Sequence, residues 1–264
     1  MIKNIPALVE KITQEISDFT DIAVIGMSGG ADSTLVATLC AKALGRENVY
    51  GFGLPYSPTD ESVFNNRSKK IANKLGMNYQ EISILGPVNR IQYETEHVVK
   101  NKLSILNLGN MRARMRMIFL YTLNQEISEQ TGKRCRVIGT GNLSEDYIGY
   151  DTKGGDALAD IFPIGQLFKS EVYQLLEYFV ENGLLIEDMI DRNPSAGLWD
   201  GQTDEGELGY TYNEMEPAIR VLMGDEIYFS QGQSELLNFV GNRHKTNKHK
   251  HESPQVIDLG DFRV

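Results

Sequence analysis

The feature that most constrains the fold is the junction "IGMSGGADST" at residues 25–34. It overlaps the end of a short apolar run at 21–27, which predicts a buried strand, and it leads into a helical pattern at 32–45 that ends at Gly45. A buried strand that turns through glycines into a helix is typical of parallel α/β sheets. Further strands are predicted at 48–55, 78–84 and 135–140.

Helical patterns separate these strands and continue after the last one. They cover residues 3–17, 60–76, 88–101, 111–130, 143–148, 169–183, 211–224 and 230–243. Two stretches without periodicity, 149–160 and 193–209, are predicted to be loops. This order predicts an α/β fold with a parallel sheet flanked by helices on both faces and a mostly helical C-terminal third. No repeat or shift in composition divides the 264 residues, so we expect a single domain over 1–264.

The charge and cysteine content limit the partners that the chain can have. A formal net charge of -10 argues against a nucleic-acid surface. The two cysteines, Cys40 and Cys135, have neither CxxC nor metal-ligand spacing, which indicates a reducing compartment. Charges interrupt the apolar residues of the N-terminus, and no apolar stretch approaches the ~18 residues of a membrane span. We therefore expect a cytoplasmic protein that binds neither nucleic acid nor membrane.

The turn between the first strand and its helix predicts an anion site. Gly29 and Gly30 let the main chain approach a bound ligand, and the amides at a helix N-terminus attract phosphate. No G-x-x-x-x-G-K-[ST] occurs in the chain, which excludes a Walker-type loop. The available hydroxyl donors are Ser28, Ser33 and Thr34.

Asp32 lies inside this predicted phosphate site. Its carboxylate would repel phosphate unless a cation stood between them, and Mg²⁺ takes one or two carboxylates together with phosphate oxygens. The sequence therefore predicts Mg²⁺ with a triphosphate at this turn. The alternative is that Asp32 only caps the helix after a glycine turn.

The order Ser-Gly-Gly-x-Asp-Ser after a strand resembles the pyrophosphatase loop of the N-type ATP pyrophosphatases, which cleave ATP to AMP and pyrophosphate while adenylating a substrate oxygen. Together with this loop, five later segments closely resemble the ammonia-dependent NAD synthetases, and the likeness runs from about residue 20 to 255. They are "NMRARMR" (110–116), "GTGNLSEDYIGYDTKGGDALAD" (139–160), "LFKSEV" (167–172), "PSAGLWDGQTDEGELGYTY" (194–212) and "HKHESP" (249–254). The resemblance implies an adenine nucleotide alpha hydrolase-like, Rossmann-like fold.

The resemblance also implies a role for individual residues. It implies that Asp32 and Glu145 hold Mg²⁺, and that Asp32, Lys169 and Asp156 are catalytic. The ATP ligands that it implies are Ser28, Gly29, Gly30, Ala31, Asp32, Ser33, Thr140, Lys169 and Ser195. The deamido-NAD ligands that it implies are Arg114, Tyr150, Lys153, Asp160, His249 and Lys250.

Several of these residues also have simpler interpretations. Glu145 could be an ordinary surface acid, and the histidines of the tail could belong to a solvated basic segment. The pair His244–Lys245 offers an alternative alignment to His249–Lys250. The segment "GTGNLSE" does not predict a dinucleotide fingerprint, because Ser144 stands where the third glycine is needed.

The implied reaction is the amidation of deamido-NAD with ammonia, which consumes ATP and gives NAD, AMP and pyrophosphate through an adenylated carboxylate. A glutaminase domain is not expected within 264 residues, so ammonia is free or comes from another protein. The resemblance further implies a homodimer with the substrate at the subunit interface. Two positions depart from the family pattern: Gly53 replaces a basic residue, and Ser195 replaces a threonine.

Two other functions remain open from the sequence. One is another ATP pyrophosphatase, such as the ATPase domain of a GMP synthetase. The other is a sensor that binds an adenine nucleotide without turnover.

Overall fold

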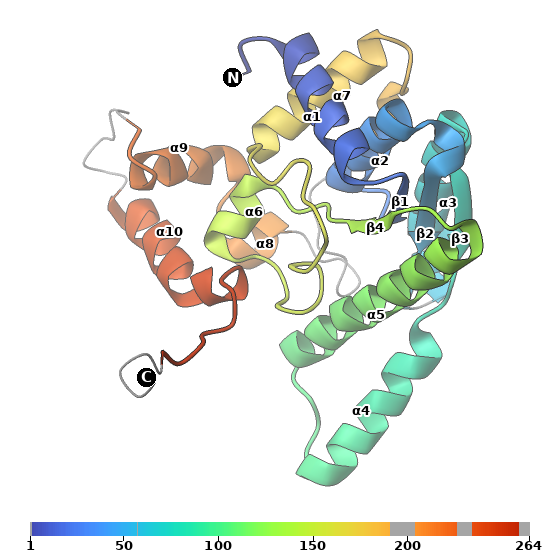
Figure 1. The fold of residues 1–264 in the computed structure, drawn as a ribbon. Coiled ribbons are helices and arrows are strands. Elements are labelled where there is room, and N and C mark those ends of the chain that lie inside the picture. Colours follow the sequence, from blue (N-terminus) through green and yellow to red (C-terminus); the bar gives the residue numbers. More distant parts are fainter. Residues whose placement is uncertain (1, 57, 191–203, 226–233, 259–264) are drawn as a thin grey trace, which may run out of the picture.

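Four parallel strands form the centre of the computed structural model (Figure 1), which describes residues 2–56, 58–190, 204–225 and 234–258, with only the backbone of 58–66. The strands are β1 (Ile22–Gly26), β2 (Val49–Gly53), β3 (Asn78–Glu81) and β4 (Cys135–Ile138). Their order in the sheet is β3-β2-β1-β4, and every neighbouring pair is parallel. The order turns back at β1, so β1 lies between β2 and the later strand β4.

Helices cover both faces of the sheet because β1 carries apolar residues on both sides. Ala23 and Ile25 pack into one core with α1 (Ile5–Phe19), α2 (Ala31–Leu44), α3 (Pro58–Leu75) and α7 (Lys169–Glu181). Ile22 and Val24 pack on the other face against α4 (Leu85–Val99) and α5 (Ile105–Thr131). Alternating side chains of one strand therefore join two separate cores. The predicted α/β fold with helices on both faces is confirmed.

The short helix after β4 and the end of the chain together form a helical layer beside the sheet. It contains α6 (Leu143–Ile148), α8 (Asp204–Leu208), α9 (Tyr212–Leu222) and α10 (Ser234–Asn247), followed by a 3-10 turn at Lys248–Lys250. These helices share a third core around Ile148, Met215 and Val240. In Figure 1, α9 and α10 stand away from the strands, with α6 closer to them.

The element boundaries differ from the sequence prediction at a few places. The strand predicted at 78–84 ends at Glu81, and the one predicted at 135–140 ends at Ile138. The helix predicted at 111–130 begins at Ile105, because Ser104 caps it by accepting a hydrogen bond from the Asn107 amide. The predicted loop 193–209 contains α8, and its residues 193–203 lie outside the described chain.

Both cysteines, Cys40 and Cys135, are buried and unpaired. Among the described residues, no helix combines the length and the apolar composition that crossing a membrane requires.

Candidate functional site

The glycine turn leaves the carboxyl end of β1 and begins α2. Gly29 has a φ of 73°, and a Cβ placed there would lie 3.0 Å from the Cβ of Arg67 and 3.1 Å from the Oγ of Ser68. A larger residue would therefore be both strained and crowded. The Ser68 hydroxyl donates to the carbonyl of Met27 at 3.0 Å, which joins α3 to the turn. Gly30 is the N-cap residue of α2, and its backbone is extended.

The hydroxyls of the turn are arranged differently from one another. The Oγ atoms of Ser28 and Ser33 lie 3.1 Å apart, and Ser28 accepts from the Gly30 amide at 3.2 Å. Thr34 is fully buried and donates its hydroxyl to the Gly30 carbonyl at 2.7 Å. The two serines therefore line the turn, while Thr34 stabilises the first turn of the helix from inside.

Three charged side chains from distant parts of the chain meet beside this turn. Lys169, the first residue of α7, places its Nζ 2.5 Å from an oxygen of Asp32 on α2 and 2.8 Å from an oxygen of Glu145 on α6. The lysine side chain is 5% exposed, and the two carboxylate side chains are 16% and 18% exposed. The two predicted metal ligands and the lysine predicted to be catalytic thus form one compact group, the Asp32–Glu145–Lys169 triad.

The triad sets one ammonium against two carboxyl groups. Burial opposes the charge of Lys169, but the two carboxylates outweigh it, so the pKa of Lys169 lies above its ordinary value. Burial and the charge of Asp32 outweigh the opposing effect of the ammonium and raise the pKa of Glu145 to about 8. These opposing directions indicate that a single ammonium does not fully compensate the two carboxylates.

Two residues that the sequence analysis missed hold the triad in place. Asn142 caps α6 by accepting from the Glu145 amide at 3.1 Å, and its side-chain amide donates to Asp32 at 2.9 Å. Glu216 on α9 is buried next to the helices that carry Glu145 and Lys169. An Asn three residues before a Glu is a recognisable capping pattern, but no pattern in the sequence indicates a role for Glu216.

Glu216 binds the immediate neighbours of both charged residues. It accepts from the hydroxyl of Ser144 at 3.0 Å, and from the amide and hydroxyl of Ser170 at 3.0 and 2.5 Å. The Ser144 hydroxyl in turn accepts from the Lys169 amide at 3.0 Å. Glu216 therefore ties the start of α7 to α6 through hydrogen bonds on both sides.

A second group joins α5, the loop after α6 and the C-terminal 3-10 turn. Arg114 donates to the carbonyl of Lys153 at 3.2 Å, and Lys153 donates to the carbonyl of His249 at 2.6 Å. Lys250 donates at 2.7 Å to the carbonyls of Gly149 and Asp151. Four of the predicted deamido-NAD ligands, Arg114, Lys153, His249 and Lys250, thus lie on segments that contact one another.

The other predicted residues lie around this second group. Tyr150 donates its hydroxyl to Glu207 of α8 at 2.7 Å. Asp156 accepts from the Thr152 amide at 2.9 Å. Asp160 accepts from the amide of Val137 in β4 at 2.8 Å. Thr140 follows the end of β4 and is partly buried, and Ala31 is the first residue of α2. Ser195 lies outside the described residues.

The alternative histidine–lysine pair is less available for a ligand. The ring of His244 stacks on Tyr147 with 4.1 Å between centroids, and its Nδ1 lies 2.9 Å from the Tyr147 carbonyl. His249 is exposed beside Lys153. Of the two histidines, His249 is therefore the more accessible.

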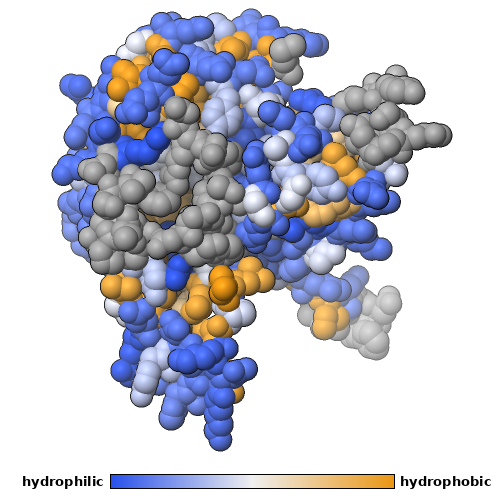
Figure 2. Space-filling model, turned by 180° about the vertical axis from the view of Figure 1, so that it is seen from behind, coloured by the Kyte–Doolittle hydropathy of each residue, from blue (hydrophilic) through white to orange (hydrophobic). Residues whose placement is uncertain are grey.

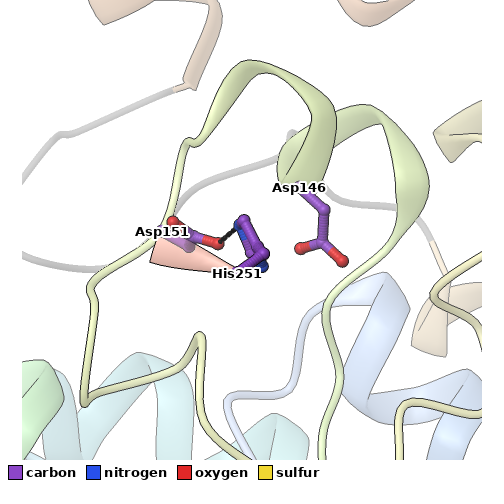
Figure 3. Close-up of side chains that lie close together, drawn as sticks. All are labelled: Asp146, Asp151 and His251. Carbon is purple, nitrogen blue, oxygen red and sulfur yellow. Dashed lines mark ion pairs between the residues drawn. The ribbon is translucent and has the colours of Figure 1, made fainter. Parts of the chain in front are cut away.

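A third cluster, which the sequence analysis also missed, attaches the end of the chain (Figure 3). Asp146 of α6, Asp151 of the following loop and His251 of the tail point toward one another, with candidate ligand atoms within 4.8 Å. The Nε2 of His251 lies 2.6 Å from Asp151. Burial raises the pKa of Asp146 to about 7, and the hydrogen bond to Asp151 raises the pKa of His251. The cluster could hold a cation, but its ion pair already explains how His251 fixes the segment that carries Lys250.

The chain is similar to known proteins over nearly its whole length. A family model described as NAD synthase matches residues 2–254. An NH(3)-dependent NAD(+) synthetase of Methanosarcina acetivorans is 39% identical over 245 residues, covering 90% of this chain and 91% of that protein.

Two solved structures have the same fold. The NH3-dependent NAD synthetase of Campylobacter jejuni, in complex with the nitrate ion, has a TM-score of 0.76 and 28% identity, covering 97% of this chain and 100% of that chain. An NMN synthetase of Francisella tularensis has a TM-score of 0.80 and 29% identity, covering 98% of this chain and 100% of that chain.

Proposed function

Because the chain belongs to the NAD synthase family, we propose that it amidates deamido-NAD with ammonia and consumes ATP, giving NAD, AMP and pyrophosphate. The observation that carries the proposal is the Asp32–Glu145–Lys169 triad beside a glycine turn at the N-terminus of α2. An anion site next to two carboxylates and a lysine suits a nucleotide triphosphate with a divalent cation. The family match favours this reaction over that of a GMP synthetase.

The reaction activates a carboxylate, which is by itself a poor acyl donor. The nicotinate carboxylate of deamido-NAD attacks the α-phosphorus of ATP, and the bond from that phosphorus to the bridging oxygen of pyrophosphate breaks. Ammonia then attacks the acyl carbon, and AMP leaves with the oxygen that came from the carboxylate. Pyrophosphate leaves as an anion in the first step and AMP leaves as an anion in the second. Catalysis therefore depends on positioning the reactants and stabilising this negative charge.

The glycine turn and Lys169 bind the phosphates in this proposal. Amides after Gly29 and Gly30, with the hydroxyls of Ser28 and Ser33, face a bound anion. Lys169 contacts Asp32 in the first turn of α2 and would stabilise charge on the departing pyrophosphate. We propose that Thr140 and Ser195 complete the ATP site.

Two carboxylates, from Asp32 and Glu145, fit a Mg²⁺ ion. Hard oxygen donors are the ligands that this ion prefers, and it is held by one or two carboxylates together with substrate phosphates. When bound, Mg²⁺ would neutralise phosphate charge and polarise the α-phosphoryl group. Asn142 orients Asp32 by a hydrogen bond at 2.9 Å, so one metal ligand is fixed in advance.

The second group of residues is proposed to bind deamido-NAD. Arg114, Lys153 and Lys250 bring three cations to one region, which suits the diphosphate of a dinucleotide. The ring of Tyr150 offers a flat apolar face for the nicotinate ring. We further propose that Asp156 orients the reacting groups and that Asp160, whose side chain accepts from the Val137 amide of β4, contacts deamido-NAD.

We propose a homodimer that is formed through the projecting helices. α4 and the start of α5 extend away from the sheet (Figure 1), and apolar side chains gather on this projection (Figure 2). The most exposed of them are Tyr93, Val98, Ile105 and Leu106, at 65%, 76%, 68% and 60%. Exposed apolar side chains that gather on one part of a surface mark a protein interaction site. The predicted substrate interface would then form between Arg114 on α5 and the second copy.

The two buried, unpaired cysteines fit the cytoplasmic location expected from the sequence.

A second candidate substrate is nicotinate mononucleotide. The likeness to an NMN synthetase, at a TM-score of 0.80, favours testing it. The chemistry would be the same amidation of an activated nicotinate carboxylate, with a substrate that lacks the adenylyl half. The two candidates therefore differ in the substrate that fills the second group of residues, not in the role of the triad.

The proposal is tested by supplying ATP, Mg²⁺ and ammonium with each acid in turn, and by measuring the amide and AMP formed. We expect equal amounts of NAD and AMP from deamido-NAD, and a higher kcat/KM than with nicotinate mononucleotide. A folded Asp32→Asn variant should form neither product. A higher kcat/KM with the mononucleotide would transfer the function to NMN synthesis. No AMP with either acid would contradict an enzyme and favour a nucleotide sensor.

A further inference from the structure

Lys169 stands where a cation for the Asp32–Glu145 pair would stand. Its Nζ lies 2.5 Å from one carboxylate and 2.8 Å from the other, at the ends of two different helices. We infer that Lys169 is the resident counter-ion of the metal carboxylates in the nucleotide-free protein, and that it blocks divalent metal binding until nucleotide phosphates draw it away. This inference rests on the proposed function, because it assigns the same site its order of binding.

The charges at the site explain why the ammonium and a divalent ion compete. With Lys169 in place, its ammonium already compensates a carboxylate of the pair, so the pair attracts a dication weakly. A dication between the same two oxygen atoms would also lie against the ammonium, in a place where the lysine is 5% exposed and solvent screens little. Without the ammonium, two nearly buried carboxylates would form an uncompensated dianion, which favours a divalent ion.

The surroundings of Lys169 hold it in this position. The backbone amide of Lys169 donates to Ser144, which is bound to Glu216. The ammonium also lies 5.5 Å from the centre of the Tyr212 ring, whose electron-rich face attracts a cation. A lysine that leaves two carboxylates therefore needs another anion to bind.

The phosphates of a nucleotide provide that anion. Asp32 lies in the first turn of α2, so a triphosphate bound at the α2 N-terminus brings its negative charge to the same side of the triad. Once Lys169 moves to the phosphates, Asp32 and Glu145 become available to bind a metal ion. Phosphate oxygens would complete the ligands of that ion. Metal and nucleotide then bind as a unit, and the free protein leaves divalent ions in solution.

Direct metal binding tests this order without any turnover. Mn²⁺ serves as the probe, because electron paramagnetic resonance measures the free ion in the absence of nucleotide. We expect Lys169→Met, which keeps the apolar stem but removes the charge, to bind one Mn²⁺ at least ten times more tightly than the wild type does. Lys169→Arg keeps a cation and should stay as weak as the wild type.

A second variant assigns the binding to this site. The Asp146–Asp151–His251 cluster is another candidate for Mn²⁺, so the gain in Lys169→Met counts only if an added Asp32→Asn substitution removes it. Circular dichroism and thermal unfolding establish that each variant is folded. If Lys169→Met does not fold, the wild type alone still decides, because tight Mn²⁺ binding at Asp32 without nucleotide would overturn the inference.

The outcomes separate this inference from the proposed function. No gain in folded Lys169→Met, while the wild type forms NAD, would overturn the counter-ion role alone. A tenfold gain that depends on Asp32, with no amide formed by the wild type, would support the counter-ion role and overturn the proposed reaction.

Discussion

Replacing Glu216 tests whether hydrogen bonds remote from the substrates hold the triad in place. Glu216→Ala removes the acceptor for the Ser144 hydroxyl and for the amide and hydroxyl of Ser170, all in a buried region. Each buried donor that loses its partner costs about 1–3 kcal/mol. Since water can enter the space that the side chain leaves, we expect a loss of about 3–5 kcal/mol in the free energy of unfolding. Glu216→Gln keeps the shape and one acceptor oxygen, so we expect a loss of about 1–2 kcal/mol.

The assay combines urea unfolding with steady-state kinetics. Glu216 acts through the neighbours of Glu145 and Lys169, which belong to the ATP side of the proposed site. We therefore expect Glu216→Gln to lower kcat and to raise the KM for ATP, while the KM for deamido-NAD stays within about twofold. Glu177→Ala, an exposed acid on α7, is the matched control and should change the free energy of unfolding by about 0.5 kcal/mol or less.

The reasoning would be refuted by a folded Glu216→Gln protein with wild-type kcat and wild-type KM for ATP. It would also be refuted if Glu216→Ala were as stable as the control, since the three donors would then have found other partners. Equal rises in the KM of both substrates would assign Glu216 a general structural role instead of a positioning role at the triad.

Three further substitutions test other parts of the account. Gly149→Ala should lower the free energy of unfolding by about 2–4 kcal/mol and raise the KM for deamido-NAD, because φ is 63° and a Cβ would lie 2.1 Å from that of Asn247; an unchanged melting temperature and KM would contradict this. Asp151→Asn should flatten the pH dependence of stability between pH 6 and 9, because the hydrogen bond to Asp151 raises the pKa of His251 above 6.5. The stabilisation by this pair is therefore fully present below about pH 6.5 and is lost as the pH rises through the raised pKa. Thermal melts of both proteins across this range would give parallel curves if the pair contributed nothing. Ile105→Glu, at a side chain that is 68% exposed, should give a folded monomer by analytical ultracentrifugation, whereas a persistent dimer would place the interface elsewhere.

Local patterns were sufficient to predict the sheet. The four strands predicted between helical patterns correspond to β1–β4, and the helix predicted at 143–148 matches α6 residue for residue. The N-terminal end of α5 was missed because residues 105–110 include Gly109 and two asparagines, which are poor helix formers. There the cap at Ser104 and the hydrogen bond from the Thr152 hydroxyl to the Asn110 side chain favour a helix that propensity does not predict.

The grouping of the site could not be read from spacing. Asp32, Glu145 and Lys169 are far apart in the chain, and only the order of segments shared with a known family put them in one site. Their contact depends on α6 and α7 starting side by side, which Ser144 and Glu216 bring about through side-chain hydrogen bonds. Such contacts between remote residues have no periodicity, so Glu216 carried no signal in the sequence.

In the proposed reaction, the nicotinate carboxylate is adenylated before ammonia attacks it. The most direct measurement uses deamido-NAD with ¹⁸O in that carboxylate, together with ATP, Mg²⁺ and ammonium, and analyses the AMP by mass spectrometry. The account predicts one ¹⁸O atom in each AMP, because the carboxylate oxygen bonded to phosphorus leaves with it. AMP without ¹⁸O, formed together with NAD, would contradict the adenylated intermediate.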